Sequence, residues 1–190
     1  PNVDFKNTFL TSYNFLNNIS KFLNKDTKII FASSSAIYGS VKGVISENTS
    51  PLKPESNYGS MKAACENFIS SFSHKYNIKS FIFRFPNVVG NNLTHGVIYD
   101  LSKKILSKQK KLEVLGNGEQ CKPYSHADEL INCMIFLKNK RKKELINFYN
   151  IGSSDKGVKV KKIVQLLIKK FNCNKKVLYQ KQKFGWPGDI

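Results

Sequence analysis

Arginine is scarce in this sequence of 190 residues: only Arg84 and Arg141 accompany 29 lysines, and the formal net charge is +18. Nucleic-acid sites commonly combine arginine forks with aromatic side chains that stack on bases. The lysines are instead spread from Lys6 to Lys183, which favours solvated helix faces over one concentrated binding surface. We therefore expect no nucleic-acid partner, although a basic module that binds polyanions without catalysis remains an alternative.

Cysteines and long apolar runs are also few. The four cysteines, at positions 65, 121, 133 and 173, have neither paired nor metal-ligand spacing, which predicts reduced thiols, no metal site and a cytoplasmic protein. No apolar run approaches membrane-spanning length, and the first residues lack the order of a signal peptide, so we expect no membrane partner.

Apolar residues make up 41% of the chain and aromatic residues 12%, which is enough for one globular domain, or for one domain and part of another. The sequence opens at Pro1 without an initiator methionine. We therefore expect the stretch to begin within a longer protein.

The first half of the chain alternates between two hydrophobic periods. Three- and four-residue steps predict helices at 5–23 and 58–75, and short apolar runs predict strands at 28–32 and 79–85. The strand at 28–32 should be buried on both faces, and residues 39–57 form a loop. This order is typical of a βαβ unit in a parallel sheet.

The second half continues the α/β pattern after a turn at 87–92. We expect helices at 97–108, 126–138 and 159–171, and strands at 112–115, 148–151 and 176–179.

A tyrosine precedes a lysine by four positions in four places: Tyr38/Lys42, Tyr58/Lys62, Tyr99/Lys103 and Tyr179/Lys183. Positions i and i+4 share one face only within a helix, which favours the second and third pairs. Only Tyr58/Lys62 also has a hydroxyl residue at a strand end 24 places upstream, Ser34. That combination singles out Tyr58/Lys62.

Such a set of residues suits proton transfer coupled to hydride transfer. A free tyrosine has a pKa near 10, but an ammonium about 4 Å from the phenolate, at an effective dielectric constant near 20, stabilises it by about 4 kcal/mol, or roughly three pKa units. Tyr58 could then accept a proton from a substrate hydroxyl that Ser34 holds. The hydride requires a cofactor, because no side chain accepts one.

Four segments resemble, in order and spacing, the extended short-chain dehydrogenase/reductase family of NAD-dependent nucleotide-sugar epimerases and dehydratases, with UDP-glucose 4-epimerases as the most similar type. They are Ser33-Ser-Ser-Ala-Ile-Tyr-Gly39, Tyr58-Gly-Ser-Met-Lys62, Arg84-Phe-Pro-Asn-Val-Val-Gly90 and Leu115-Gly-Asn-Gly-Glu-Gln120.

The resemblance implies a role for each matching residue. Tyr58 would be the catalytic base, Lys62 would hold the nicotinamide ribose and lower the tyrosine pKa, and Ser34 would complete the catalytic set. The implied contacts with NAD come from Asn7, Ser33, Tyr58, Lys62 and Pro86.

The same resemblance implies that Ser34, Asn87, His95 and Lys122 bind a nucleotide-diphospho-sugar. Lys122 stands where the family usually has an arginine, and an ammonium offers a point charge in place of a fork. Turn capping and surface charge are the alternative interpretations of Asn87, His95 and Lys122.

One departure concerns the cofactor cradle. No glycine-rich phosphate-binding turn occurs in the sequence. We therefore expect the latter part of a Rossmann-type domain at residues 1–90 and an incomplete α/β substrate-binding region at 91–190, with residues about 126–151 returning to the first domain. Such a fragment should bind NAD weakly or not at all and be inactive, whereas the intact protein should form a homodimer, as family members do.

A second departure concerns the reaction. The sugar dehydratases of the family place an acidic pair just after the catalytic hydroxyl residue, and this sequence has Ser35 and Ala36. The resemblance therefore implies epimerisation at carbon 4, with dehydration, decarboxylation or reduction as alternatives.

Overall fold

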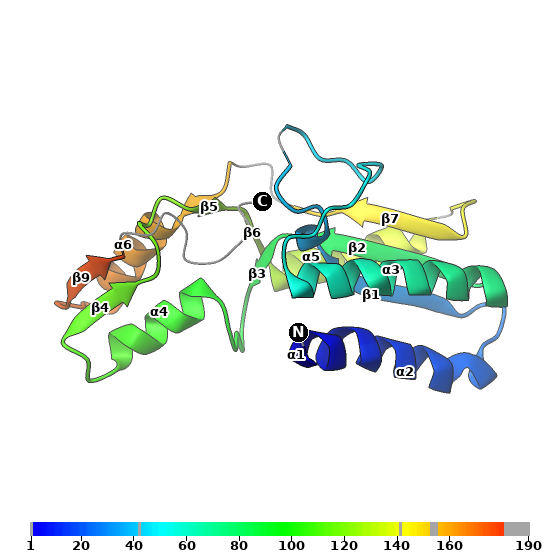
Figure 1. Ribbon diagram of the computed structural model, residues 1–190, viewed down its shortest axis with the longest axis horizontal. Helices are drawn as coiled ribbons and strands as arrows, with labels where there is room; N and C mark the ends of the chain where they lie inside the picture. Colours follow the sequence, from blue (N-terminus) through cyan, green and yellow to red (C-terminus); the bar gives the residue numbers. More distant parts are fainter. Residues whose placement is uncertain (1, 42, 141, 153–155, 181–190) are drawn as a thin grey trace. The chain divides into compact units, whose positions relative to one another are not determined.

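The computed structural model of the chain describes residues 2–41, 43–140, 142–152 and 156–180 (Figure 1). These residues form two compact units. The first contains the chain up to Pro86 together with Asp128–Gly152, and the second contains Asn87–Ala127 and the described residues from 156 onwards. The helices and mainly parallel strands confirm the predicted α/β class.

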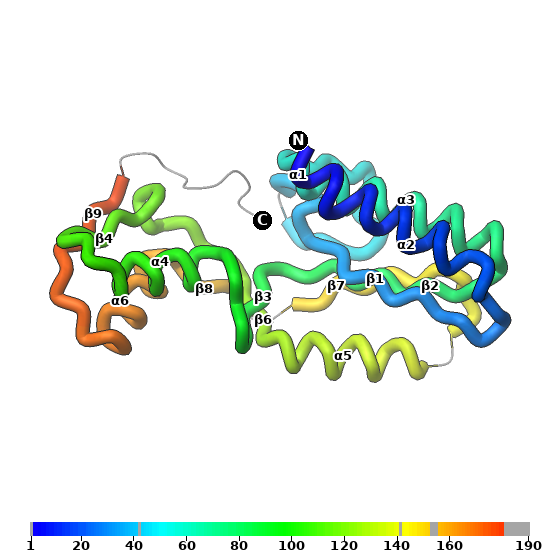
Figure 2. Tube along the Cα trace, turned by 90° about the horizontal axis from the view of Figure 1, so that it is seen from below, coloured from blue at the N-terminus to red at the C-terminus, as the bar shows by residue number. Residues whose placement is uncertain are grey.

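The first unit is built on a parallel sheet of three strands, β1 (Lys28–Ser34), β2 (Lys79–Phe85) and β7 (Ile146–Asn150), in the order β1-β2-β7. Helix α3 (Asn57–Tyr76) and the N-terminal helices lie on one face, and α5 (Ala127–Asn139) lies on the other (Figure 2). The strands are parallel, so their carboxyl ends lie at one edge, where open α/β sheets bind ligands.

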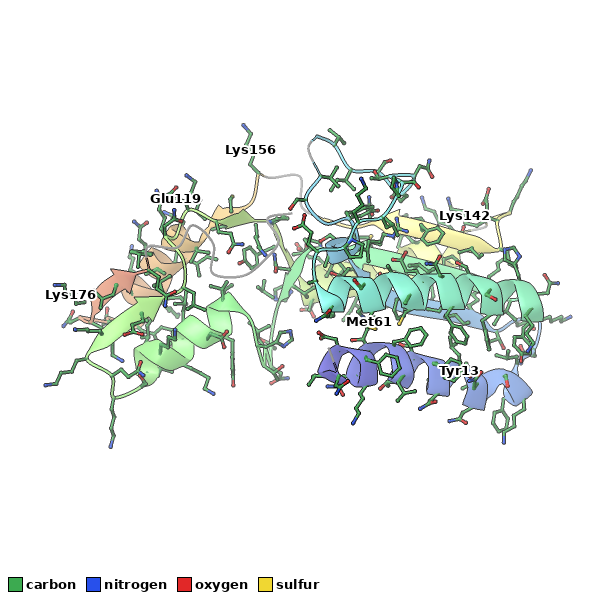
Figure 3. The ribbon with its side chains drawn as sticks, viewed as in Figure 1. Tyr13, Met61, Glu119, Lys142, Lys156 and Lys176 are labelled. Carbon is green, nitrogen blue, oxygen red and sulfur yellow. The ribbon has the colours of Figure 1, made fainter. Side chains whose placement is uncertain are left out.

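The N-terminal helical run is less regular than the single helix predicted at 5–23. It comprises α1 (Asn2–Asp4), a π-helical segment η1 (Phe5–Leu10), α2 (Thr11–Ile19) and a 3₁₀ turn η2 (Ser20–Phe22). Aromatic side chains fill the space between this run and α3, as Figure 3 shows. The buried core between these helices and the sheet consists of Leu16, Ile29, Ile69, Phe72, Ile78 and Ile82.

Strand β1 corrects one expectation. It runs two residues past 32, to Ser34, and is buried on one face only: Ile29 is 8% exposed and Ile30 is 43% exposed. The reason is packing: Ile29 lies in the core with residues of the N-terminal helices and α3, and Ile30, as the next residue of the strand, points to the opposite face. Apolar composition alone does not distinguish such a strand from a central one.

Helix α3 agrees with its prediction to within one residue at each end. Its N-cap is Ser56, whose hydroxyl accepts a hydrogen bond from the Gly59 N–H at 3.0 Å. Asn77 ends the helix in the left-handed conformation, at φ 50°.

The second unit holds α4 (Val97–Leu106) and α6 (Val160–Lys170) with three pairs of short strands. Strands β3 (Asn87–Val89) and β6 (Tyr124–His126) are parallel, as are β4 (Lys111–Val114) and β9 (Lys176–Tyr179), whereas β5 (Cys121–Lys122) and β8 (Val158–Lys159) are antiparallel. The turn expected from residue 87 is therefore wrong for 87–89, and β5, β6 and β8 were not predicted. The core consists of Leu101, Ile105, Leu112, Val114, Val160, Ile163 and Val164.

Within the described ranges, no helix combines the length and the apolar character that a membrane span requires.

Candidate active site

Ser34 is the last residue of β1 and the N-cap of a short 3₁₀ turn, η3 (Ser35–Ile37). Its hydroxyl accepts a hydrogen bond from the Ala36 N–H at 3.2 Å. The cap fixes the side chain where the strand leaves the sheet, so the hydroxyl lies at the ligand-binding edge.

The start of α3 packs closely against η3 because residue 59 is glycine. A Cβ at Gly59 would lie 2.5 Å from the Ala36 carbonyl oxygen, closer than two such atoms approach in proteins. The contact brings Tyr58, the residue before Gly59, close enough to Ser34 for the serine hydroxyl to oppose a rise in the pKa of the phenol. A glycine at this position is therefore a condition for the pairing of tyrosine and serine.

Lys62 lies one helical turn after Tyr58. Its Nζ donates to the Ala32 carbonyl oxygen at 2.7 Å and lies 5.7 Å from the centroid of the Tyr58 ring. The same ammonium lies 4.9 Å from the centroid of the Phe31 ring. Ser34, Tyr58 and Lys62 thus come together at the carboxyl end of β1, as the spacing of the sequence indicated.

The electrostatics differ from the expectation. Burial raises the pKa of Tyr58 above its usual value, the Ser34 hydrogen bond opposes that shift, and the charge of Asp4 adds to it. Burial also lowers the pKa of Lys62, against the charges of Cys65 and Glu66. The net shift of the tyrosine pKa is therefore upward, because the cost of burying a phenolate prevails, and its lowering by Lys62 stays a prediction. The Tyr58 side chain is still 40% exposed, so solvent limits the shift.

Asn7, Ser33 and Pro86, the other residues predicted to contact the cofactor, belong to the same unit. Asn7 is exposed on η1, and Pro86 is half-buried directly after β2. Ser33 is 2% exposed and its hydroxyl donates to Glu66 at 2.5 Å, so this hydroxyl already has a partner inside the protein. Their contacts with a cofactor stay predictions.

Asn87, His95 and Lys122 lie in the second unit. The side-chain amide of Asn87 donates to the Pro123 carbonyl oxygen at 3.2 Å, and the His95 ring is 3.2 Å from the Thr94 hydroxyl. Lys122 is on β5. Their roles in substrate binding stay predictions.

The alternative Tyr/Lys pairs lack the features of Tyr58/Lys62. Tyr99 and Lys103 lie on α4 of the second unit, with the ammonium 5.3 Å from the ring centroid, a similar geometry without a serine at a strand end. In the pairs Tyr38/Lys42 and Tyr179/Lys183, the lysines lie outside the described residues.

Sequence reasoning assigned no role to a buried ion pair beside the site. Glu66 on α3 and Arg84 on β2 are 3% and 5% exposed and lie 2.7 Å apart. Two signals were available: Glu66 is the only acidic residue of the helix predicted at 58–75, and Arg84 interrupts an apolar strand. A charge in a buried strand needs a partner of opposite sign, so these two residues could have been paired.

The fold, the strand-end serine and the adjoining tyrosine and lysine all agree with one family. Residues 1–152 match the NAD dependent epimerase/dehydratase family. The chain belongs to this family.

An uncharacterised UDP-glucose epimerase of Bacillus subtilis is 30% identical to the chain over 139 residues, which are 73% of this chain and 43% of that protein. The human dTDP-D-glucose 4,6-dehydratase is 28% identical over 127 residues, 67% of this chain and 36% of the human protein. A crystal structure of a UDP-galactose 4-epimerase matches with a TM-score of 0.81 and 26% identity, over 98% of this chain and 60% of that one. The chain thus spans less than half the length of the two sequence relatives, and the Rossmann-type fold is confirmed.

The chemistry of the donor set fits part of a nicotinamide dinucleotide. Lys62 uses its ammonium on one carbonyl oxygen, and an ammonium has three N–H donors, so donors remain for ribose hydroxyls. Tyr58 and Ser34 supply hydroxyl groups on the same edge of the sheet. The glycine-rich turn that would hold the pyrophosphate does not occur in this sequence, and the contacts of these residues with the nicotinamide half of the cofactor stay predictions.

Proposed function

We propose that the protein, at its complete length, is an NAD-dependent epimerase that inverts carbon 4 of a nucleotide-diphospho-sugar. The observation that carries this proposal is the proximity of Ser34 and Tyr58, with Lys62 one turn away, at the carboxyl end of a parallel strand. Family membership supports NAD as the cofactor, and the B. subtilis UDP-glucose epimerase supports a UDP-sugar as the substrate.

In this proposal Ser34 holds the oxygen of the 4-hydroxyl group and Tyr58 takes its proton as carbon 4 becomes a ketone. NAD, when bound, supplies the acceptor and donor of the hydride. Tyr58 returns the proton to the oxygen after the keto sugar has turned its other face. Lys62 binds the ribose and stabilises the phenolate, so the phenol must reach a lower pKa in the working enzyme than it has in this chain.

Dehydration is the main alternative reaction within the family, because the human relative is a dTDP-D-glucose 4,6-dehydratase. Elimination needs an acid and a base beside the catalytic hydroxyl. Ser35 and Ala36 follow Ser34 in η3, and neither is acidic. The residues of this turn therefore favour epimerisation over dehydration.

Product analysis separates the two reactions. The complete gene product is incubated with UDP-glucose and the products are followed by ¹H NMR. We expect the anomeric signal of UDP-galactose and no 4-keto-6-deoxy sugar. The keto product would refute epimerisation in favour of dehydration. UDP-N-acetylglucosamine and UDP-glucuronic acid are tested in the same way, and if all three UDP-sugars stayed unchanged, the proposed substrate class would be refuted. The 190-residue chain alone should show no turnover.

We also propose a cytoplasmic homodimer. All four cysteines are free, which is common in a reducing compartment. The N-terminal helices expose Phe5, Phe15 and Phe22, at 44%, 60% and 74%, and such a surface favours burial against a second copy. Light scattering on the complete protein tests this: a monomer mass at micromolar concentration would exclude the dimer.

A further inference from the structure

A buried polar network lies next to the proposed catalytic residues in the first unit. Glu66 accepts hydrogen bonds on Oε1 from the Ser33 hydroxyl at 2.5 Å and from Arg84 Nε at 3.1 Å, and on Oε2 from Arg84 Nη2 at 2.7 Å. All three side chains are at most 5% exposed. Helix α3 is thereby tied to the ends of β1 and β2.

The network continues from Arg84 to the third strand. Arg84 Nη1 donates to the Tyr38 hydroxyl at 2.7 Å and to the Glu47 carbonyl oxygen at 3.1 Å. The Tyr38 hydroxyl donates in turn to Asn150 Oδ1 on β7, also at 2.7 Å. One guanidinium group therefore connects the carboxyl ends of all three strands of the sheet.

Ser34 lies between two anchored residues. Ser33 precedes it and is held by Glu66, and Tyr38, the C-cap of η3, follows the turn that Ser34 itself caps. Neighbouring side chains of a strand point to opposite faces. Holding the Ser33 hydroxyl inward thus fixes the direction in which the Ser34 hydroxyl leaves the strand.

We propose that Ser33, Glu66 and Arg84 are positioning residues, which hold the Ser34 hydroxyl toward Tyr58 and keep Lys62, one turn before Glu66, against the end of β1. The proposal rests on the proposed function, because it assigns these residues to the same site. A buried ion pair contributes little net stability compared with apolar side chains of the same volume, so stability alone does not account for the network. Proton transfer, in contrast, is sensitive to geometry, since a misplacement of about 1 Å can cost about a hundredfold in rate.

Ser33→Ala tests the proposal with the smallest change, because it removes one hydroxyl and leaves Glu66 paired with Arg84. The matched control is Ser80→Ala. Ser80 is also a fully buried serine of the same sheet, and its hydroxyl is hydrogen-bonded to that of Ser73 on α3, but it lies at the amino end of β2, away from the site. Both variants lose one buried serine hydroxyl.

The assay measures kcat and KM of the complete gene product with UDP-glucose, together with Tm. We expect Ser33→Ala to lower kcat at least tenfold with KM within twofold of wild type, because the interaction lost acts in the transition state. Ser33→Thr, which restores a hydroxyl, should recover part of kcat. Ser80→Ala should lower Tm to a similar degree and leave kcat within twofold. Equal kcat values for the two alanine variants, whether both unchanged or both reduced, would overturn the proposal.

A second measurement does not depend on turnover. The pKa of the Tyr58 phenol is read by ¹³C NMR of labelled tyrosine, with Tyr58→Phe to assign the signal. The charged groups that face this phenol, Lys62 and Asp4, are unchanged in Ser33→Ala. Displacement of the Ser34 hydroxyl should raise the phenol pKa in this variant, as in Ser34→Ala, and an unchanged pKa would overturn the positioning role. If the wild-type protein were inactive but Ser33→Ala still raised the phenol pKa, the proposed function would be refuted and the positioning role would stand.

Discussion

Replacing Glu66 and Arg84 singly and together measures how much these two buried charges stabilise each other. Glu66→Leu leaves a guanidinium that is 5% exposed with only neutral partners, the Tyr38 hydroxyl and the Glu47 carbonyl. Breaking a buried pair in this way costs about 3–5 kcal/mol. For a protein of 150–250 residues, 1 kcal/mol shifts Tm by about 2–4 °C, so the loss is roughly 6–20 °C. Arg84→Met leaves the carboxylate and should destabilise to a similar degree.

The double variant Glu66→Leu/Arg84→Met should be more stable than either single variant. It buries no charge, and an apolar replacement of an ion pair is often neutral. The double variant still leaves the buried Ser33 hydroxyl without its hydrogen-bond acceptor. An unsatisfied buried group of this kind destabilises the protein by about 1–3 kcal/mol. A large favourable coupling energy is thus expected between the two substitutions.

Urea unfolding of the four proteins, followed by circular dichroism, measures this coupling. Glu119→Gln is the matched control, because it breaks the exposed ion pairs of Glu119 with Lys159 and Lys161 and should lower the free energy of unfolding less than either single variant of the buried pair. If the two single losses simply added in the double variant, the pair would carry no mutual stabilisation and the reasoning would be refuted.

Two further outcomes follow from close contacts in each unit. Gly59→Ala should destabilise the protein by about 1–3 kcal/mol through overpacking and reduce turnover, since its Cβ meets a backbone oxygen at 2.5 Å. Gly152→Ala is the control: its Cβ has ordinary contacts from 3.8 Å, so thermal unfolding and kcat should not change. Glu119, labelled in Figure 3, should titrate by NMR near a pKa of about 2, lowered from 4.5 by hydrogen bonds from Lys159 and then Lys161. Because the folded-state pKa is the lower one, its contribution to stability is present above about pH 4.5 and disappears as the pH falls through 2; a pKa of 4.5 would contradict the ion pairs.

The periodic elements of the chain could be predicted because local pattern determines them. Helix α3 and strand β2 combine regular spacing with clear ends, Ser56 and Asn77 for the helix and Pro86 for the strand. The proximity of Tyr58 and Lys62 followed from the same source, since the helical turn that joins them is local.

The strands that were missed depend on partners distant in the sequence. Strand β5 consists of Cys121–Lys122 and pairs with Val158–Lys159, and β3 pairs with Tyr124–His126. Strands of two or three residues contain too few positions for a period-2 pattern to register. Their pairing arises from tertiary contacts and leaves no local signal.

The pKa of Tyr58 could not be predicted because it depends on burial. Charge and spacing indicated a lysine close enough to lower it, but the ammonium of Lys62 is directed to the Ala32 carbonyl and burial dominates the phenol. Similarly, the one-sided exposure of Ile30 depends on which face of β1 packs against the helices. Both quantities belong to the packed structure rather than to any segment of sequence.

The most direct measurement of the central claim is turnover of UDP-glucose by the Tyr58→Phe variant of the complete gene product, with NAD content measured on the same sample. We predict loss of turnover by at least a hundredfold with NAD still bound, because only the proton-transferring oxygen is removed. Tyr99→Phe is the control, as Tyr99 faces Lys103 in a similar geometry but has a lysine, and no serine, 24 places upstream, and it should retain wild-type turnover. Full turnover by Tyr58→Phe would contradict the account.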